Sequence, residues 1–342
     1  MILDPILYLI AYPPLWQVLI LGFLGSLAVA MVAIWFERKA AARVQRRIGP
    51  YWASPALGGF LNIIADMVRY VLQQLIIPGT VDRLTFYVAP IAAFIVSILP
   101  VIFIPLSSRP EFWPVASMDY SLLIALALST LPPLLIIAAG WSSNNKFAVI
   151  GSMRESYVIT AYELVAVVSI LSASAATLTF NLVHIVDAQQ PFKWLIILNP
   201  IAFLAAVLAV LMSTSAFPFE IPESEHEVVA GPYTEYSGAL YAFNMGGAYV
   251  RRFVYALIIA LVFLGGWAPY VPGPGPITGY VIPSIIVVLK ALIIVLFISF
   301  LRAVYGRYRL DQALGAAWRL AIPLAIVGFG WSLLLAYIGV FH

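Results

Sequence analysis

Apolar segments of about 20 residues recur along this chain, and they limit its possible folds more than any other feature. Each has about the length that an α-helix needs to cross ~30 Å of hydrocarbon. Lipid offers no partners to backbone N–H and C=O groups, so such segments must be helices. We therefore predict an all-α polytopic membrane protein with one transmembrane domain over residues 1–342. The eight predicted spans run at about 15–36, 84–106, 119–140, 158–182, 195–216, 252–268, 280–301 and 319–340.

The positions of lysine and arginine predict how these spans are oriented. Of the 18 basic residues, 15 fall in one set of loops, whereas only Arg109 and Lys193 fall in the other set and Lys290 lies inside a span. Loops rich in lysine and arginine face the cytoplasm. Both termini are therefore expected on the outer face, which agrees with an even number of spans. Because the basic residues lie beside membrane spans, the pI near 9 does not indicate a nucleic-acid partner.

One short cytoplasmic loop, residues 217–238, concentrates the acidic residues. Five of the 15 Asp and Glu residues fall there, namely Glu220, Glu223, Glu225, Glu227 and Glu235. Carboxylates beside hydrocarbon are costly to keep ionised, and they persist where protons, ions or polar ligands are handled. Cysteine is absent, and His184 and His226 lack the spacing of metal ligands, so we expect no metal site.

The connection between the first two spans has the pattern of an amphipathic helix over about 55–76. Apolar residues recur there at helical spacing, and Asn62, Asp66, Arg69 and Gln73 fall on the opposite stripe. Such a helix lies in the membrane interface. It either floats there or lines the mouth of a site for a lipid-soluble ligand.

Two charged residues fall well inside predicted spans rather than at their ends. Glu163, which follows Tyr162, either handles protons or makes a structural hydrogen bond. A charge at such a depth costs on the order of 3 kcal/mol. Lys290 is either the buried partner of such a carboxylate or a lysine that reaches towards the interface.

Five motifs along the chain resemble the H-type membrane subunit of respiratory complex I, the family of mitochondrial subunit 1. The resemblance covers nearly the whole chain in order, with eight spans as in that family. The motifs are ERKAAARVQRRIGP at 37–50, IADMVRY at 64–70, GWSSNNKFAVIGSMRESYVITAYE at 140–163, FPFEIPESEHEVVAGPYTEYSG at 217–238 and LRAVYGRYRLDQALGAAWRLAIPL at 301–324.

The resemblance implies a subunit of a proton-translocating quinone oxidoreductase that has no catalytic activity on its own. It implies a quinone, or a similar membrane-soluble carrier, as substrate and no covalently bound cofactor. Flavin and iron–sulfur clusters would belong to peripheral-arm partners that also hold the quinone headgroup. Small membrane subunits and antiporter-like pumping subunits would be the other partners, besides lipid. The implied location is a prokaryotic plasma membrane or a thylakoid-type membrane.

Site residues carry over by motif from the same resemblance. The family assigns one group to the quinone tunnel and docking rim, and a second group to proton coupling between the quinone cavity and the membrane path. The first group is Glu37, Arg38, Arg46, Arg47, Asp66 and Arg69; the second is Tyr162, Glu163, Glu220, Glu223, Glu225, Glu227 and Glu235.

Departures from the family pattern bear on the proton route and on NADH as the electron donor. A further family glutamate stands here as Ala248, before Tyr249, and the lysine of the entrance helix stands as Arg69.

Two other functions stay open. One is the homologous anchor subunit of an energy-converting hydrogenase, which needs no quinone. The other is an independent secondary transporter, although no inverted repeat is visible in the sequence.

Overall fold

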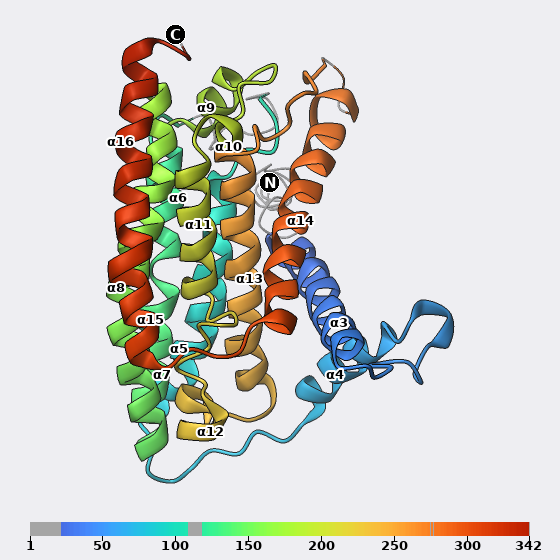
Figure 1. The fold of residues 1–342 in the computed structure, drawn as a ribbon. Coiled ribbons are helices and arrows are strands. Elements are labelled where there is room, and N and C mark those ends of the chain that lie inside the picture. The colour runs from blue at the N-terminus through green and yellow to red at the C-terminus, as the bar shows by residue number, and fades with distance from the viewer. Residues whose placement is uncertain (1–21, 109–117, 274, 276, 342) are drawn as a thin grey trace, which may run out of the picture.

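A computed structural model describes residues 22–108, 118–273, 275 and 277–341, and the elements in these ranges are helices joined by turns and loops (Figure 1). The long helices are α3 (Ser26–Val44), α5 (Arg83–Ile98), α8 (Lys146–Thr177), α11 (Pro200–Ser213), α13 (Gly238–Val262), α14 (Ile282–Val304) and α16 (Ile322–Ile338). The shorter ones are α4 (Leu61–Leu72), α6 (Ser121–Ser129), α7 (Pro132–Ser142), α9 (Leu182–Ala188), α10 (Leu195–Leu198), α12 (Glu225–Val228) and α15 (Leu310–Ala316). Short 3₁₀ turns follow α3 and α5 and precede α13, and π-helical turns precede α14 and α16.

Six helical segments in the described residues have the length and composition to cross a membrane. They are 83–103, 121–142, 146–177, 238–262, 277–304 and 310–338. The all-α prediction is therefore confirmed for the described part. The first predicted span begins outside it and continues into α3. The fifth predicted span is divided, because Asn199 caps a new helix whose first residue is Pro200, which leaves α11 with 14 residues.

Two predicted bounds were wrong for local reasons. Helix α8 begins at Lys146 rather than 158, because the Asn145 side chain accepts a hydrogen bond from the Phe147 N–H and caps the helix. The amphipathic helix is shorter than 55–76, since Gly58 and Gly59 have φ of 60° and 84° and interrupt it before α4 begins. It ends at Leu72, because the backbone of the next residue, Gln73, is extended.

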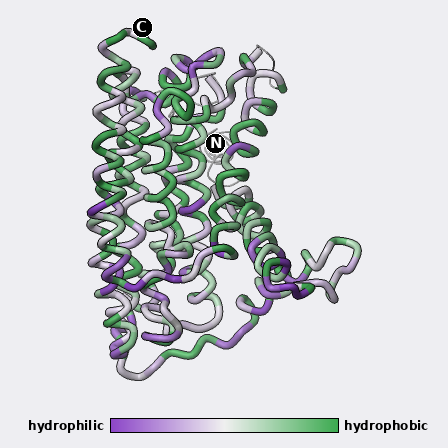
Figure 2. Tube along the Cα trace, viewed as in Figure 1, coloured by the Kyte–Doolittle hydropathy of each residue, from purple (hydrophilic) through white to green (hydrophobic). Residues whose placement is uncertain are grey.

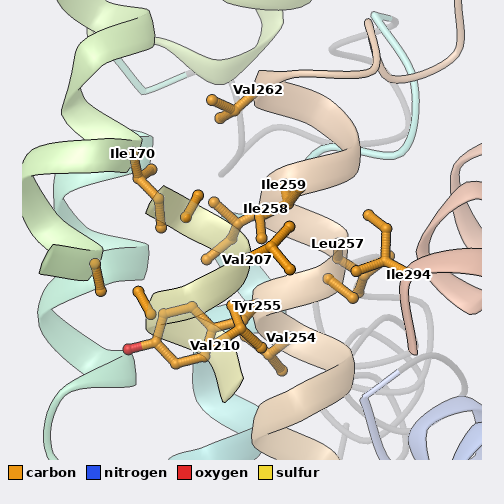
Figure 3. Packing of buried hydrophobic residues seen from close by; sticks show 14 of the residues in the cluster. Ile170, Val207, Val210, Val254, Tyr255, Leu257, Ile258, Ile259, Val262 and Ile294 are labelled. Atoms are coloured by element: carbon orange, nitrogen blue, oxygen red, sulfur yellow. The ribbon is translucent and has the colours of Figure 1, made fainter. Parts of the chain in front are cut away.

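Helix α13 occupies the centre of the bundle, and every residue from Val250 to Val262 is buried. It packs against α5 and α14, while α16 runs along α8 and α11. Apolar side chains of α8, α11, α13 and α14 interlock around it (Figure 3). Hydrophobic residues cover the helices, and hydrophilic ones gather at the end that carries α4 and α12 (Figure 2). The core thus fixes α13, and with it any charged residue that α13 carries.

Candidate functional site

A buried carboxylate on α3 is held by two arginines from different helices. Glu37, 6% exposed, accepts hydrogen bonds from Arg252 of α13 at 2.8 Å and from Arg302 of α14 at 3.2 Å. The Tyr249 hydroxyl donates a third at 2.9 Å. Removing one member of a buried ion pair costs about 3–5 kcal/mol, because the remaining charge is left uncompensated. Glu37 therefore joins three helices at one point.

The acidic loop adds a second carboxylate to this ion network. Glu220 accepts a hydrogen bond from Arg307 at 2.5 Å and lies 4.0 Å from Arg302. Both arginines also lie over the ring of Phe217, with centroid distances of 5.0 and 5.5 Å. Arg302 therefore stands between Glu37 and Glu220 and links the tunnel group predicted from sequence to the coupling group.

These residues surround a cavity of about 180 Å³. Glu37, Glu220, Arg252 and Arg302 contribute to its wall, and so does Glu223. The pKa of Glu223 is raised to about 8: burial contributes most, Glu220 and Glu155 also raise it, and Arg302 and Arg307 oppose the rise. At neutral pH this carboxyl is therefore mostly protonated, and a modest change in the surrounding charge is enough to alter its proton occupancy.

A second polar cluster lies deeper in the bundle, on α8 and α13. The fully buried Tyr162 donates its hydroxyl proton to Glu155 at 2.8 Å. Arg251, 3% exposed, acts electrostatically on both Glu155 and Glu163. The carboxylate oxygens of Glu163 and the hydroxyl of Tyr255 are buried without hydrogen-bond partners among the described residues. Buried polar atoms of this kind are normally satisfied by water or by a change of protonation.

A second, much smaller cavity joins the two clusters. It holds about 10 Å³, close to the space of one water molecule. Glu155, Arg251 and Tyr233 line it, and it shares four wall residues with the larger cavity: Thr214, Ser215, Glu223 and Ala248. Thr214, Ser215, Ala248 and the carboxyl of Glu223 therefore lie between the ion network and the cluster of Glu155 and Arg251.

The other glutamates of the acidic loop hold it to α8. Glu227, which is about half exposed, pairs with Arg154, and Glu235 accepts a hydrogen bond from the Asn145 side chain. Glu225 begins α12, but its side chain lies outside the described residues. Thus Glu220 and Glu223 face the cavity, whereas Glu227 and Glu235 attach the loop at its other end.

The predicted docking rim lies at the end of the molecule that carries α4. Arg38 and Asp66 form an ion pair of 2.7 Å between α3 and α4, with both side chains partly exposed. Arg46 and Arg47 are exposed in the turn that follows α3, and Arg69 lies exposed over the Tyr70 ring. None of these side chains pairs with a member of the buried ion network among the described residues, although Arg38 directly follows Glu37 on α3.

Lys290 has a partner that neither sequence-based interpretation foresaw. Its ammonium donates to the carbonyls of Leu264, Gly266 and Ala268 at 2.6–2.7 Å, and it lies 4.7 Å from the centroid of the Trp194 ring. These carbonyls follow the end of α13, where backbone acceptors lack helical partners. Lys290 therefore stabilises the loop after α13.

Several site residues escaped the sequence reasoning. Arg251, Arg252, Arg302 and Arg307 were counted only as loop charges, yet the structure buries the first two inside α13. Their signal was present, because two adjacent arginines interrupt an otherwise apolar 25-residue helix. Glu155 also had a signal, since it precedes Tyr162 by two helical turns and so shares its face.

Metal binding has no geometric support in the described part of the chain. No group of three or more His, Asp or Glu side chains there could hold an ion. The chemistry available at the site is that of carboxyls, phenols and guanidinium groups.

Comparison with known proteins gives a consistent result. The sequence profile of the NADH dehydrogenase family matches residues 16–333. The chain is similar to the H subunit of the NADH-quinone oxidoreductase of Geobacillus kaustophilus, with 35% identity over 92% of this chain and 93% of the relative. It is also similar to the corresponding protein of Thermomicrobium roseum, with 32% identity over 92% and 96%. The H subunit of the F(420)H(2) dehydrogenase of Methanosarcina mazei is 31% identical over 91% and 89%.

Proposed function

Because this chain belongs to the NADH dehydrogenase family, as an H-type membrane subunit of complex I, we propose that it forms the quinone-access tunnel of such an enzyme and couples quinone reduction to proton translocation. The observation that carries the proposal is the cavity of about 180 Å³, walled by the Glu37–Arg252–Arg302–Glu220 network and by Glu223. This cavity, with both carboxyl and guanidinium groups in its wall, would lie between the exposed rim and the carboxylates of α8. Quinone reduction creates negative charge, and this wall contains groups that respond to it.

The response follows from the electrostatics of Glu223. Arg302 and Arg307 are the cations that lower its pKa. An anionic quinone in or near the cavity attracts these arginines away from Glu220 and adds its own negative charge. Both changes raise the pKa of Glu223 further, so this carboxyl takes up a proton. When the quinone is neutralised, the arginines return and the proton is released.

The proton route that we propose leads from Glu223 into the membrane part of the bundle. The four residues shared by the two cavities lie at the start of this route, and Glu155, Tyr162 and Glu163 continue it along α8. Thr214 has a hydroxyl that can orient water in the gap. Ala248 leaves space there rather than a further carboxyl. Glu220, Glu225, Glu227 and Glu235 would then set the charge and position of the loop.

In this proposal, partner subunits carry the redox centres and bind the electron donor. Peripheral-arm subunits with flavin and iron–sulfur clusters would dock on the rim of Arg38, Arg46 and Arg47, and small and antiporter-like membrane subunits would receive the coupling. The named relatives act on NADH or F(420)H(2), so either donor is compatible with the chain. The carrier would be a quinone or a comparable membrane-soluble molecule.

The membrane arrangement that we propose retains eight spans, with both termini outside and the acidic loop in the cytoplasm of a prokaryote. The C-terminal end and α9 lie at one end of the bundle, whereas α12 and α15 lie at the other (Figure 1). Lys193 lies with the first end, and the arginines of 302–309 lie with the second. The charge asymmetry along the sequence is therefore also an asymmetry between the two ends of the fold.

Proton translocation by the assembled complex tests the proposal. Glu163→Gln and Glu223→Gln should lower the number of protons moved per electron in reconstituted vesicles, while the complex still assembles and still reduces quinone. Asp311→Asn is the matched control, because it removes one exposed carboxylate that lies outside the walls of both cavities. Undiminished pumping in both Glu163→Gln and Glu223→Gln would overturn the coupling role. A purified complex with no reducible quinone would instead favour the hydrogenase-type alternative.

A further inference from the structure

A further hollow, separate from the two cavities described above, opens on the outside of the bundle between α14 and α16. It has a volume of about 410 Å³ and is floored by α11. Helix α14 packs on α3 and α13, whereas α16 packs on α8 and α11, so the two helices separate (Figure 1). We call this hollow the α11 groove.

The α11 groove is apolar along its length and exposed to the surroundings of the bundle. Leu204 and Leu208 form part of its floor, Phe297 is on one wall and Leu320 is on the other. Leu204, Phe297 and Leu320 are each more than half exposed. All of them lie on apolar helices, so the groove faces hydrocarbon when those helices span a membrane.

The groove has room for a single flexible chain. Its floor runs from Leu204 to Met212, which at 1.5 Å per residue is ~12 Å. Its volume of about 410 Å³ lies along this floor and is open to the outside of the bundle. The charges at its end decide between an acyl chain with an anionic headgroup and an apolar helix of a partner.

Aromatic and basic residues lie at the end of the groove near the acidic loop. Tyr305 and Tyr308 line that end, and tyrosines are enriched where a bilayer meets water. Arg309 follows Tyr308, and Arg319 precedes Leu320; both are exposed, and Asp311 offsets only one of these charges. A net positive charge thus lies beside the open end of an apolar slot.

We propose that the α11 groove binds one acyl chain of an anionic phospholipid, with its phosphate beside Arg319 and Arg309. Bulk lipid tails are as apolar as the groove, so burial of the tail gives little preference for one lipid over another. Selectivity comes from the headgroup, and each nearby arginine favours an anionic lipid by about fivefold. This site is separate from the proposed quinone cavity and does not depend on it.

Native mass spectrometry of the intact complex tests the site. The detergent-purified complex is stripped of loosely held lipid and titrated with phosphatidylglycerol or phosphatidylcholine. We expect phosphatidylglycerol to be retained preferentially, Arg319→Gln to reduce this preference about fivefold, and Leu208→Trp to remove one bound phosphatidylglycerol by filling the groove. Val327→Trp is the control, because it adds the same bulk at an exposed position of α16 outside the groove wall.

Three outcomes would overturn the proposal. They are an unchanged lipid count in Leu208→Trp, equal retention of the two phospholipids by the wild-type complex, and displacement of the bound lipid by a long-tailed quinone. If Arg319→Gln fails to assemble, Arg319→Lys should assemble and keep the headgroup preference, because it retains the charge. Loss of the preference in Arg319→Lys would also count against the site.

Discussion

Among the single residues of this chain, Glu223 has the most informative ionisation. Its pKa of about 8 means that the carboxyl is protonated in most molecules at pH 7 and loses its proton as the pH rises towards 9. Infrared difference spectra of the complex should show a protonated-carboxyl band that disappears over that range and is absent in Glu223→Gln. In Arg307→Met the band should persist to higher pH, because one of the cations that lower this pKa is gone. Titration near pH 4.5 would contradict the assignment, and Asp311→Asn, which removes an exposed carboxylate outside the cavity wall, should leave the band unchanged.

Lys290 permits a stability prediction of a different kind. Its ammonium satisfies three carbonyls after α13, and hydrogen bonds to charged groups contribute about 1.5–3 kcal/mol each. We expect Lys290→Met to lower the free energy of unfolding by about 3 kcal/mol, measured by titration with a denaturing detergent. Lys193→Met is the control, since it removes one exposed bond to the Val340 carbonyl and should cost at most about 0.5 kcal/mol. Equal losses in the two variants would show that the carbonyl contacts contribute little.

At the residue scale, the sequence predicted which residue types matter better than it predicted their partners. Glu37 and Glu220 were assigned through separate motifs, yet the structure joins them through Arg302. Such a contact spans more than 180 positions of sequence, and no local pattern encodes it. The inventory of acidic residues was visible in the sequence, but the division of the loop between cavity and attachment points was not.

At the scale of elements, α4 carries its own prediction. Its apolar side remains exposed, as at Val68 and Val71, and Asp66 on the polar side pairs with Arg38. If α4 lines the tunnel mouth, Asp66→Trp should slow turnover of a long-tailed quinone, because it breaks this ion pair and adds bulk on the polar side. Val71→Trp adds the same bulk on the exposed apolar side and should have little effect. Unchanged kinetics with a long-tailed quinone in both variants would place the mouth elsewhere.

Hydropathy predicted where helices occur in the chain. It did not predict where they begin or end, because single polar contacts determine the ends. The eight predicted spans all overlap helical segments in the described residues, but Asn145 and Asn199 move two of the boundaries. A hydropathy window averages over such residues, while one side chain that caps an N-terminus decides where a helix begins. The prediction assigned Arg251 and Arg252 to a loop for a similar reason. Two adjacent charged residues indicate a loop unless their buried partners are known.

At the scale of the whole molecule, the absence of cysteine makes the topology directly testable. His184 and Asp311 are exposed at opposite ends of the bundle. In whole cells, His184→Cys should react with a membrane-impermeant maleimide, whereas Asp311→Cys should react only after the membrane is opened. The reverse pattern would invert the orientation predicted from the basic residues, and labelling of both in intact cells would contradict a membrane-spanning bundle.

The charged residues around the cavity of about 180 Å³ determine how it binds an anion, as a count of their charges shows. Its three arginines exceed Glu37 and Glu220 by one positive charge while Glu223 is protonated, and ionised Glu223 brings the cluster to neutrality. An anion and an ionised Glu223 therefore compete to neutralise the same positive charge. Thermodynamic linkage makes this competition reciprocal. An anion that raises the pKa of Glu223 by about one unit must itself bind roughly tenfold more tightly when Glu223 is protonated.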